Sequence, residues 1–331
     1  MFKDKNVLIT GGTGSLGKAL TKFFVENCKD LKRLIIFSRD EQKQFQMSQE
    51  FPESKYPFMR YFIGDVRDID RLNRAFTGVD YVIHAAAMKH VHIAEYNPDE
   101  CVKTNINGAQ NVILASISNN VKRVVALSTD KACAPINLYG ATKLASDKLF
   151  VAANNFKGSS DIRLSVVRYG NVMGSNGSVI PFFIKMKTKG FLTITSEEMT
   201  RFNITLKRGV ECVLHALENA WGGEIFIPKL KSYKILDIAN SIGPECEKKI
   251  IGIRPGEKIH EEMITESDSF NTYDLGHYYV ILPSVPNWSL EDFLNKVKAI
   301  KVPPNFTYNS KNNDSWETVE SLKKMIENNI L

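Results

Sequence analysis

The 331-residue sequence has no long apolar run, no run of five basic residues and only five cysteines. No stretch approaches the roughly 20 apolar residues needed to cross a bilayer, and no signal peptide precedes the first predicted strand. We therefore expect a cytoplasmic protein that does not contact membranes. The cysteines are odd in number and far apart, which predicts reduced thiols and no metal site.

The net charge of +6 does not by itself indicate a nucleic-acid partner, because Lys and Arg are interspersed with Asp and Glu along the chain. We expect no nucleic acid and favour a small anionic ligand. A hydrophobic content of 43% is enough for a large core, and the length predicts a nucleotide-binding domain with a smaller second domain.

The amino terminus has the pattern of a strand, a glycine-rich turn and a helix. Apolar residues 6–10 lead into Gly11-Gly12-Thr13-Gly14-Ser15-Leu16-Gly17, and a helical pattern follows over 18–27. Gly11 permits the tight turn, Gly14 lets the backbone approach a pyrophosphate, and Gly17 allows the helix to pack closely on the sheet. The pattern predicts a dinucleotide site.

The next predicted strand, 33–37, ends in Ser38-Arg39-Asp40. Enzymes selective for NAD usually present an acidic residue to the ribose at this point. Arg39 could instead pair with a 2′-phosphate as a planar fork, with Ser38 and Lys43 as further donors, which favours NADP. Asp40 could still reach a ribose, or it could cap the following helix.

Two short motifs combine an acid, an amine and a Tyr/Lys couple. Asp130-Lys131 follow the apolar strand 124–127, at the edge where open α/β sheets bind ligands, and Tyr139 and Lys143 share one helix face. Asp130 could act as an acid if desolvation raises its pKa, and Lys131 as a base if burial lowers its pKa. Taken alone, Asp130-Lys131 could equally be a solvated ion pair on a loop.

Together these motifs resemble those of the extended short-chain dehydrogenase/reductase family, whose members mostly act on nucleotide-linked sugars. Further blocks resemble the inverting UDP-N-acetylglucosamine 4,6-dehydratases over nearly the whole chain. These blocks are 85–91, 94–98, 128–131, 168–172, 199–202 and 254–258. The resemblance implies an α/β fold, a Rossmann-type doubly wound parallel sheet with a smaller α/β substrate-binding domain.

The expected NADP-binding domain covers 1–170 with a returning segment near 203–230, and the expected UDP-sugar domain covers 171–202 and 231–331. The tail 305–331 could be a lid or an oligomer contact. The resemblance also implies a homo-oligomer, either a dimer or a hexamer. One departure from the family pattern is Asn203, where a bulky aromatic residue is expected.

The motifs and the resemblance together give three sets of candidate site residues. The catalytic set is Asp130, Lys131, Tyr139 and Lys143. The cofactor set is Gly11, Thr13, Gly14, Ser15, Leu16, Gly17, Ser38, Arg39, Lys43, Asp65, Val66, Ala85, Ala86, Lys89, Thr104, Tyr139 and Lys143. The substrate set is Lys89, Thr129, Asn171, Val179, Thr193, Arg201, Arg254 and Glu257, in which the arginines, with Asn171 and Lys258, would bind the diphosphate.

The implied reaction starts from UDP-N-acetylglucosamine and gives UDP-2-acetamido-2,6-dideoxy-β-L-arabino-hex-4-ulose, the first step of pseudaminic acid biosynthesis for flagellin glycosylation. Tyr139, its pKa lowered by Lys143 and the nicotinamide, would accept the proton of the sugar 4-hydroxyl, and Asp130 and Lys131 would perform the elimination. NADP would stay tightly bound and be regenerated in each turnover. A UDP-sugar 4-epimerase, a retaining 4,6-dehydratase and an NADP-binding sensor without turnover remain alternatives.

Overall fold

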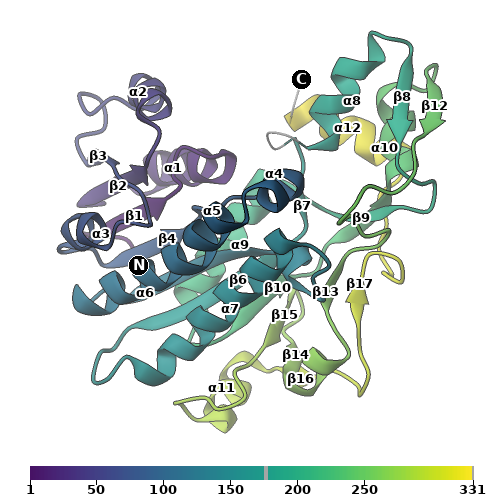
Figure 1. Ribbon diagram of the computed structural model, residues 1–331. Coiled ribbons are helices and arrows are strands. Elements are labelled where there is room, and N and C mark those ends of the chain that lie inside the picture. Colours follow the sequence, from purple (N-terminus) through teal and green to yellow (C-terminus); the bar gives the residue numbers. More distant parts are fainter. Residues whose placement is uncertain (175–177, 330–331) are drawn as a thin grey trace.

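The computed structural model describes residues 1–174 and 178–329, and its main feature is a ten-stranded sheet. Six parallel strands follow the order 3-2-1-4-5-6 of a Rossmann fold, β10 adds a seventh parallel strand, and three antiparallel strands complete the edge (Figure 1). In spatial order the strands are β16 (Ile300–Lys301), β14 (Thr272–Asp274), β15 (Tyr278–Ile281), β10 (Ile225–Pro228), β6 (Arg163–Tyr169), β5 (Arg123–Thr129), β4 (Tyr81–His84), β1 (Asn6–Thr10), β2 (Arg33–Ser38) and β3 (Met59–Ile63). The Rossmann sheet expected from the sequence is confirmed.

The central strands are apolar runs because helices cover both faces of the sheet. All five residues of β1 are buried, and β2 is buried after its first residue. The covering helices are α1 (Ser15–Asn27), α2 (Glu41–Glu50), α3 (Ile69–Phe76), α4 (Val91–Tyr96), α5 (Pro98–Val102), α6 (Gly108–Ser118), α7 (Leu138–Phe156) and α9 (Leu206–Asn219). Helices α3, α6 and α7 pack side by side on one face, and α1 contacts α9 on the other. None of the described helices is both long and apolar enough to cross a membrane.

A second, smaller unit has its own apolar core, seen at the upper right of Figure 1. Leu192, Ile238 and Leu322 are fully buried there. The elements around this core are α8 (Val179–Lys187), β8 (Phe191–Ile194), α10 (Ile235–Ile242), β12 (Glu247–Ile250) and α12 (Val319–Asn329). Because α12 supplies buried core residues, the tail is a structural element of this unit in the described chain.

Short strands connect the two units. A three-stranded sheet consists of β11 (Lys231–Lys234), β9 (Thr200–Ile204) and β7 (Asn171–Val172), and β13 (Glu262–Ile264) pairs with β17 (Tyr308–Asn309). These strands bring residues from the second half of the chain to the carboxyl end of β5, because β13 contacts the short 3-10 turn Asp130–Ala132 that follows it.

The expected domain division differs from the structure in one respect. It assigned all of 231–331 to the second domain, but β14, β15 and β16, with α11 (Leu290–Val297) between the last two, extend the main sheet. These strands are two to four residues long and antiparallel, so neither an apolar run nor a strand–helix alternation marks them in the sequence. Residues 175–177 and 330–331, part of the same expected domain, lie outside the described residues.

Candidate active site

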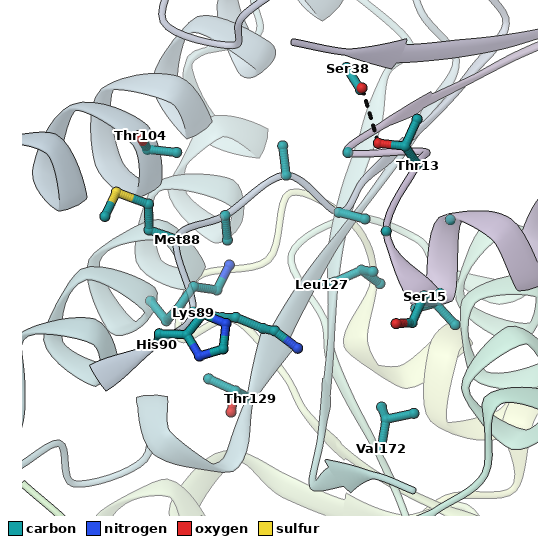
Figure 2. A pocket seen from close by; sticks show the side chains of 18 of the residues that line it. Thr13, Ser15, Ser38, Met88, Lys89, His90, Thr104, Leu127, Thr129 and Val172 are labelled. Atoms are coloured by element: carbon teal, nitrogen blue, oxygen red, sulfur yellow. Dashed lines mark hydrogen bonds between the residues drawn. The ribbon is translucent and has the colours of Figure 1, made fainter. Parts of the chain in front are cut away.

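A cavity of about 780 Å³ runs along the carboxyl edge of the parallel strands. Figure 2 shows Ser38 and Thr13 toward one end of the cavity and Thr129 and Val172 toward the other. Every residue predicted for the cofactor lines this cavity. They are Gly11, Thr13, Gly14, Ser15, Leu16, Gly17, Ser38, Arg39, Lys43, Asp65, Val66, Ala85, Ala86, Lys89, Thr104, Tyr139 and Lys143.

The glycine-rich turn has the shape that a pyrophosphate needs. Gly11 has φ +64°, and a Cβ there would lie 2.7 Å from the Ala86 nitrogen. A Cβ on Gly17 would lie 2.3 Å from the Gly12 carbonyl oxygen, so only glycine lets the start of α1 pack this closely on the glycine-rich turn. The N-cap residue of α1 is Gly14, which has no side chain to bond the first N–H groups of the helix, and such N–H groups can bind an anion.

One end of the cavity is formed by the residues after β2. The Thr13 and Ser38 hydroxyls are 3.1 Å apart, and Arg39 is 61% exposed with Nη1 3.9 Å from Asp65 Oδ2. Asp40 caps α2, because its Oδ1 accepts the Lys43 N–H at 3.0 Å, and its Oδ2 lies 2.8 Å from Lys43 Nζ. These bonds to Lys43 hold the pKa of Asp40 below its usual value. Of the two roles considered for Asp40, the structure shows the helix cap.

The loop after β4 is held by hydrogen bonds to the Asn105 side chain, and Asn105 lies in a π-helical turn (Lys103–Asn107). Asn105 Oδ1 accepts the Met88 N–H at 2.8 Å, and its Nδ2 donates to the Met88 carbonyl at 3.0 Å and to Thr142 Oγ1 at 3.0 Å. The neighbouring Lys89 lines the cavity, and burial lowers its pKa. Thr104 lines the same cavity, and its hydroxyl is buried without a hydrogen-bond partner in the described chain.

Asp130 and Lys131 form an ion pair at the end of β5. Lys131 Nζ lies 3.1 Å from Asp130 Oδ1, and the Thr129 hydroxyl donates to the same oxygen at 3.0 Å. Burial raises the pKa of Asp130, with Lys131 opposing the shift, as the acid role requires.

The expectation that burial lowers the pKa of Lys131 is wrong. Burial works to lower its pKa, but Asp130 and the Glu261 carboxylate, 3.0 Å away, outweigh burial and raise it. Lys131 is therefore held as an ammonium in the structure.

Tyr139 and Lys143 project from the start of α7, which is capped by Asn137 through the Gly140 N–H at 2.8 Å. Burial raises the pKa of Tyr139 to about 12, and the opposing effects come from the Lys131 charge and a hydrogen bond with Thr129. The phenol pKa is therefore raised in the protein and not lowered as expected, and the protein cation that opposes burial most is Lys131 in place of Lys143.

The pKa of Lys143 is itself lowered by burial, against the opposing charge of Asp147. Asp147 is buried and accepts hydrogen bonds from the Ser128 hydroxyl at 2.7 Å and from Arg168 Nη2 at 3.3 Å.

Two buried carboxylates at the site, Glu261 and Asp147, were not predicted from the sequence. Asp147 lies one turn after Lys143, and this spacing was a signal that could have revealed it. Glu261 contacts Lys131 from 130 positions away, and its position in the polar segment after the 254–258 block has no periodic pattern. No local rule would have found it.

The predicted substrate residues fall into two groups. Lys89, Thr129 and Asn171 line the cavity, whereas Val179, Thr193, Arg201, Arg254 and Glu257 do not. Val179 begins α8 directly after Ser178, which does line the cavity, and Thr193 lies in β8. Arg254 Nη1 is 3.8 Å from Glu257 Oε1, and Lys258 Nζ donates to the Cys133 carbonyl at 2.5 Å.

Arg201 was expected to bind the diphosphate, but it does not line the cavity. It is only 7% exposed, and its Nη1 donates to the Thr200 and Ile259 carbonyls at 2.7 and 3.0 Å. Its Nε lies 3.6 Å from Glu261 Oε1, so the guanidinium serves an internal carboxylate in place of the expected diphosphate. The geometry could not be seen from the sequence, because Glu261 reaches Arg201 only through the fold.

Asn203 is buried in β9 and pairs in register with Asn171 of β7. Its Nδ2 lies 3.6 Å from the Met325 sulfur of α12, so the side chain packs toward the second unit. Among the described residues, no group of His, Cys, Asp or Glu side chains could hold a metal ion, and all five cysteines are free thiols.

The fold and this cavity define an extended short-chain dehydrogenase/reductase. The sequence profile described as "Polysaccharide biosynthesis protein" matches residues 7–283. The chain is 57% identical, over 98% of both chains, to a UDP-N-acetylglucosamine 4,6-dehydratase (inverting) from Campylobacter jejuni subsp. jejuni. It belongs to the polysaccharide biosynthesis protein family and, within it, to the inverting UDP-N-acetylglucosamine 4,6-dehydratases.

Two other relatives mark the range of this similarity. A UDP-glucose 4-epimerase from Rickettsia prowazekii is 44% identical over 85% of this chain and 84% of its own length. The X-ray structure of Pen from Bacillus thuringiensis superposes with a TM-score of 0.89 at 39% identity, covering 99% of this chain and 98% of that one.

Proposed function

We propose that the protein is an inverting UDP-N-acetylglucosamine 4,6-dehydratase that makes UDP-2-acetamido-2,6-dideoxy-β-L-arabino-hex-4-ulose. The observation that carries the proposal is the meeting of Asp130, Lys131 and Tyr139 on one cavity wall, with Lys131 Nζ 3.1 Å from Asp130. The extensive identity to the Campylobacter dehydratase supports it.

The cofactor that this proposal requires is a nicotinamide dinucleotide, with NADP preferred over NAD. Three features fit such a group. They are the start of α1 without a side-chain cap, the Gly11 backbone without a side chain in the way, and the Thr104 hydroxyl without a partner in the described chain. Arg39 and Ser38 are the donors we assign to a 2′-phosphate, since Asp40 is occupied by its helix cap. When bound, the oxidised nicotinamide supplies a positive charge beside the phenol and a reversible hydride acceptor for the sugar.

In the first step Tyr139 would have to be a phenolate in order to receive the proton of the sugar 4-hydroxyl. Its own surroundings keep the phenol protonated, because burial raises its pKa to about 12. Lys131 and the Thr129 hydroxyl favour the phenolate, so the protein supplies part of the stabilisation that this step needs. Lys143, on the same face of α7, is the residue we assign to the nicotinamide ribose.

In the second step a ketone at C4 makes the C5 hydrogen acidic and the C6 hydroxyl an eliminable group. Asp130, whose raised pKa favours the protonated carboxyl, donates to the departing hydroxyl. Lys131 takes the C5 proton, and it must first pass to Asp130, 3.1 Å away, the extra proton that Asp130 and Glu261 stabilise. The reactive form, with protonated Asp130 and neutral Lys131, holds the same single proton as the ion pair, so the elimination rate should be flat with pH and fall once the pH exceeds the pKa of Lys131.

For the substrate we propose UDP-N-acetylglucosamine, with Lys89 and Thr129 at the sugar and Asn171 at the diphosphate. Val179, Thr193, Arg254 and Glu257 remain predicted contacts that lie outside the cavity lining. Entry of the product into pseudaminic acid biosynthesis and flagellin glycosylation is proposed from the sequence resemblance, as are a homo-oligomer and a cytoplasmic location.

A second candidate function is a UDP-sugar 4-epimerase, because the Rickettsia relative carries that name at 44% identity. An epimerase would use Tyr139 and the cofactor but would need no acid/base pair for elimination. The retaining 4,6-dehydratase differs only in the face to which the C5 proton returns.

The deciding experiment incubates the purified protein with UDP-N-acetylglucosamine in D2O, without reductant, and follows the sugar by proton NMR. A 6-deoxy methyl signal, deuterium at C5 and the L-arabino coupling pattern support the proposal. A 6-deoxy product with its original C5 configuration indicates the retaining reaction. A UDP-N-acetylgalactosamine spectrum without a 6-deoxy methyl signal indicates the epimerase, and unchanged substrate beside bound cofactor indicates a sensor or another substrate.

A further inference from the structure

A chain of alternating charges runs from the second half of the sequence to the proposed acid/base pair. Arg201 Nε lies 3.6 Å from Glu261 Oε1, and the same oxygen lies 3.0 Å from Lys131 Nζ. Lys131 Nζ is in turn 3.1 Å from Asp130 Oδ1. The Lys131 ammonium therefore lies between two carboxylates, one local and one from the segment before β13.

Glu261 is held rigidly in this position. Its side chain is 2% exposed, and Ser310 clamps its backbone, accepting the Glu261 N–H at 2.9 Å and donating its own N–H to the Glu261 carbonyl at 2.7 Å. Its Oε2 is buried and has no hydrogen-bond partner among the described residues, and both of its ion pairs are made by Oε1. A buried carboxylate is costly unless it is paired, and the partners of Glu261 are Lys131 and Arg201.

We propose that Glu261 is a positioning residue for Lys131: anchored by Arg201, it fixes the ammonium opposite Asp130 and controls how readily Lys131 releases its proton. The acid/base unit of the elimination is then three residues. The link to elimination rests on the proposed function, whereas the control of Lys131 by Glu261 does not.

The groups that face Lys131 come from several elements. Asp130 and Glu261 favour the ammonium, and Arg201 of β9 opposes it. Tyr139 of α7 and Tyr233 of β11 are buried phenols whose pKa values are both raised to about 12, so they stay neutral near pH 8. Removing the Glu261 charge leaves Arg201 unopposed and should lower the pKa of Lys131 by about 1–3 units.

The test measures the reactivity of Lys131 with trace acetic anhydride at pH 8, read by peptide mass spectrometry on the whole protein. Only the neutral amine reacts, so at a pH well below its pKa each unit of decrease gives a tenfold faster labelling. In the Glu261→Gln variant, Lys131 should be acetylated at least about tenfold faster than in the wild-type protein. The matched control is Glu262→Gln, the adjacent carboxylate, which interacts with Lys258 and Asp268 and should leave Lys131 labelling unchanged.

Glu261→Asp separates charge from packing, because it keeps the charge and withdraws it by one methylene. In this variant Lys131 should be acetylated at close to the wild-type rate, while kcat for formation of the 6-deoxy product falls about 10- to 100-fold at unchanged KM. This variant also tests the proposal if Glu261→Gln fails to fold, which circular dichroism would reveal.

Two labelling results would overturn the inference: a wild-type rate in folded Glu261→Gln, or a rate as fast in Glu261→Asp as in Glu261→Gln, which would indicate loosened packing. If the aspartate variant keeps the wild-type kcat, the positioning role is wrong. Failure of the wild-type protein to form any methyl product would instead contradict the proposed function, and the labelling comparison would still decide the role of Glu261.

Discussion

Replacing Lys131 by methionine should destabilise the protein in a pH-dependent way, because the ammonium separates two buried carboxylates. At 3.1 Å from Asp130 and 3.0 Å from Glu261, each attraction is worth at most ~5 kcal/mol at an effective dielectric constant of about 20. The cost of desolvating the charges offsets most of this attraction. Removing one partner of a buried pair typically costs about 3–5 kcal/mol, and since the Lys131 side chain is 24% exposed we expect about 3 kcal/mol at pH 8.

The sign of the pH dependence follows from Asp130. Its pKa is already raised in the folded protein, and loss of the Lys131 charge raises it further. A carboxyl with a raised folded-state pKa stabilises the fold below its unfolded pKa, and this contribution is lost as pH rises through the folded value. The cost of Lys131→Met should therefore be largest at pH 8 and shrink toward pH 5.

Urea unfolding of both proteins at pH 8 and pH 5 measures this difference. The control is Lys22→Met, whose ammonium is 67% exposed and 3.9 Å from Glu26, and which should cost at most about 0.5 kcal/mol at either pH. The reasoning is refuted if Lys131→Met costs less than about 1 kcal/mol at pH 8, or if its cost is equal at both pH values. The variant should also bind cofactor normally, by fluorescence, yet form no methyl product by NMR.

Three further predictions concern the cavity. Tyr139→Phe should lower the rate of 4-keto formation by about 10²–10⁴, measured by NMR, and an undiminished rate would remove the tyrosine from the first step. Arg39→Ala should weaken NADP+ binding by about tenfold or more and leave NAD+ unchanged in calorimetry, whereas equal effects on both would contradict the 2′-phosphate role. Gly17→Ala, whose Cβ would lie 2.3 Å from the Gly12 oxygen, should cost about 1–3 kcal/mol of stability in urea unfolding, and a neutral result would contradict the close packing of α1.

The sequence predicted the first half of the molecule well because its signals there are local. The strand β1 ends at Thr10 and α1 begins at Ser15, on either side of the glycine turn that marks them. Tyr139 and Lys143 lie on one face of α7 because four residues make about one helical turn. The order of apolar strands and helices was sufficient to predict a Rossmann sheet with its site at the carboxyl edge.

The electrostatics of the site were decided by the tertiary structure. The sequence identified Asp130 and Lys131 as a pair, but the pKa of Lys131 depends on Glu261, which the β13 segment brings within 3.0 Å of it. Arg201, expected at the diphosphate, faces that same carboxylate. Coulomb energy depends on distance in space, so charges far apart in the chain stay hidden until folding brings them together.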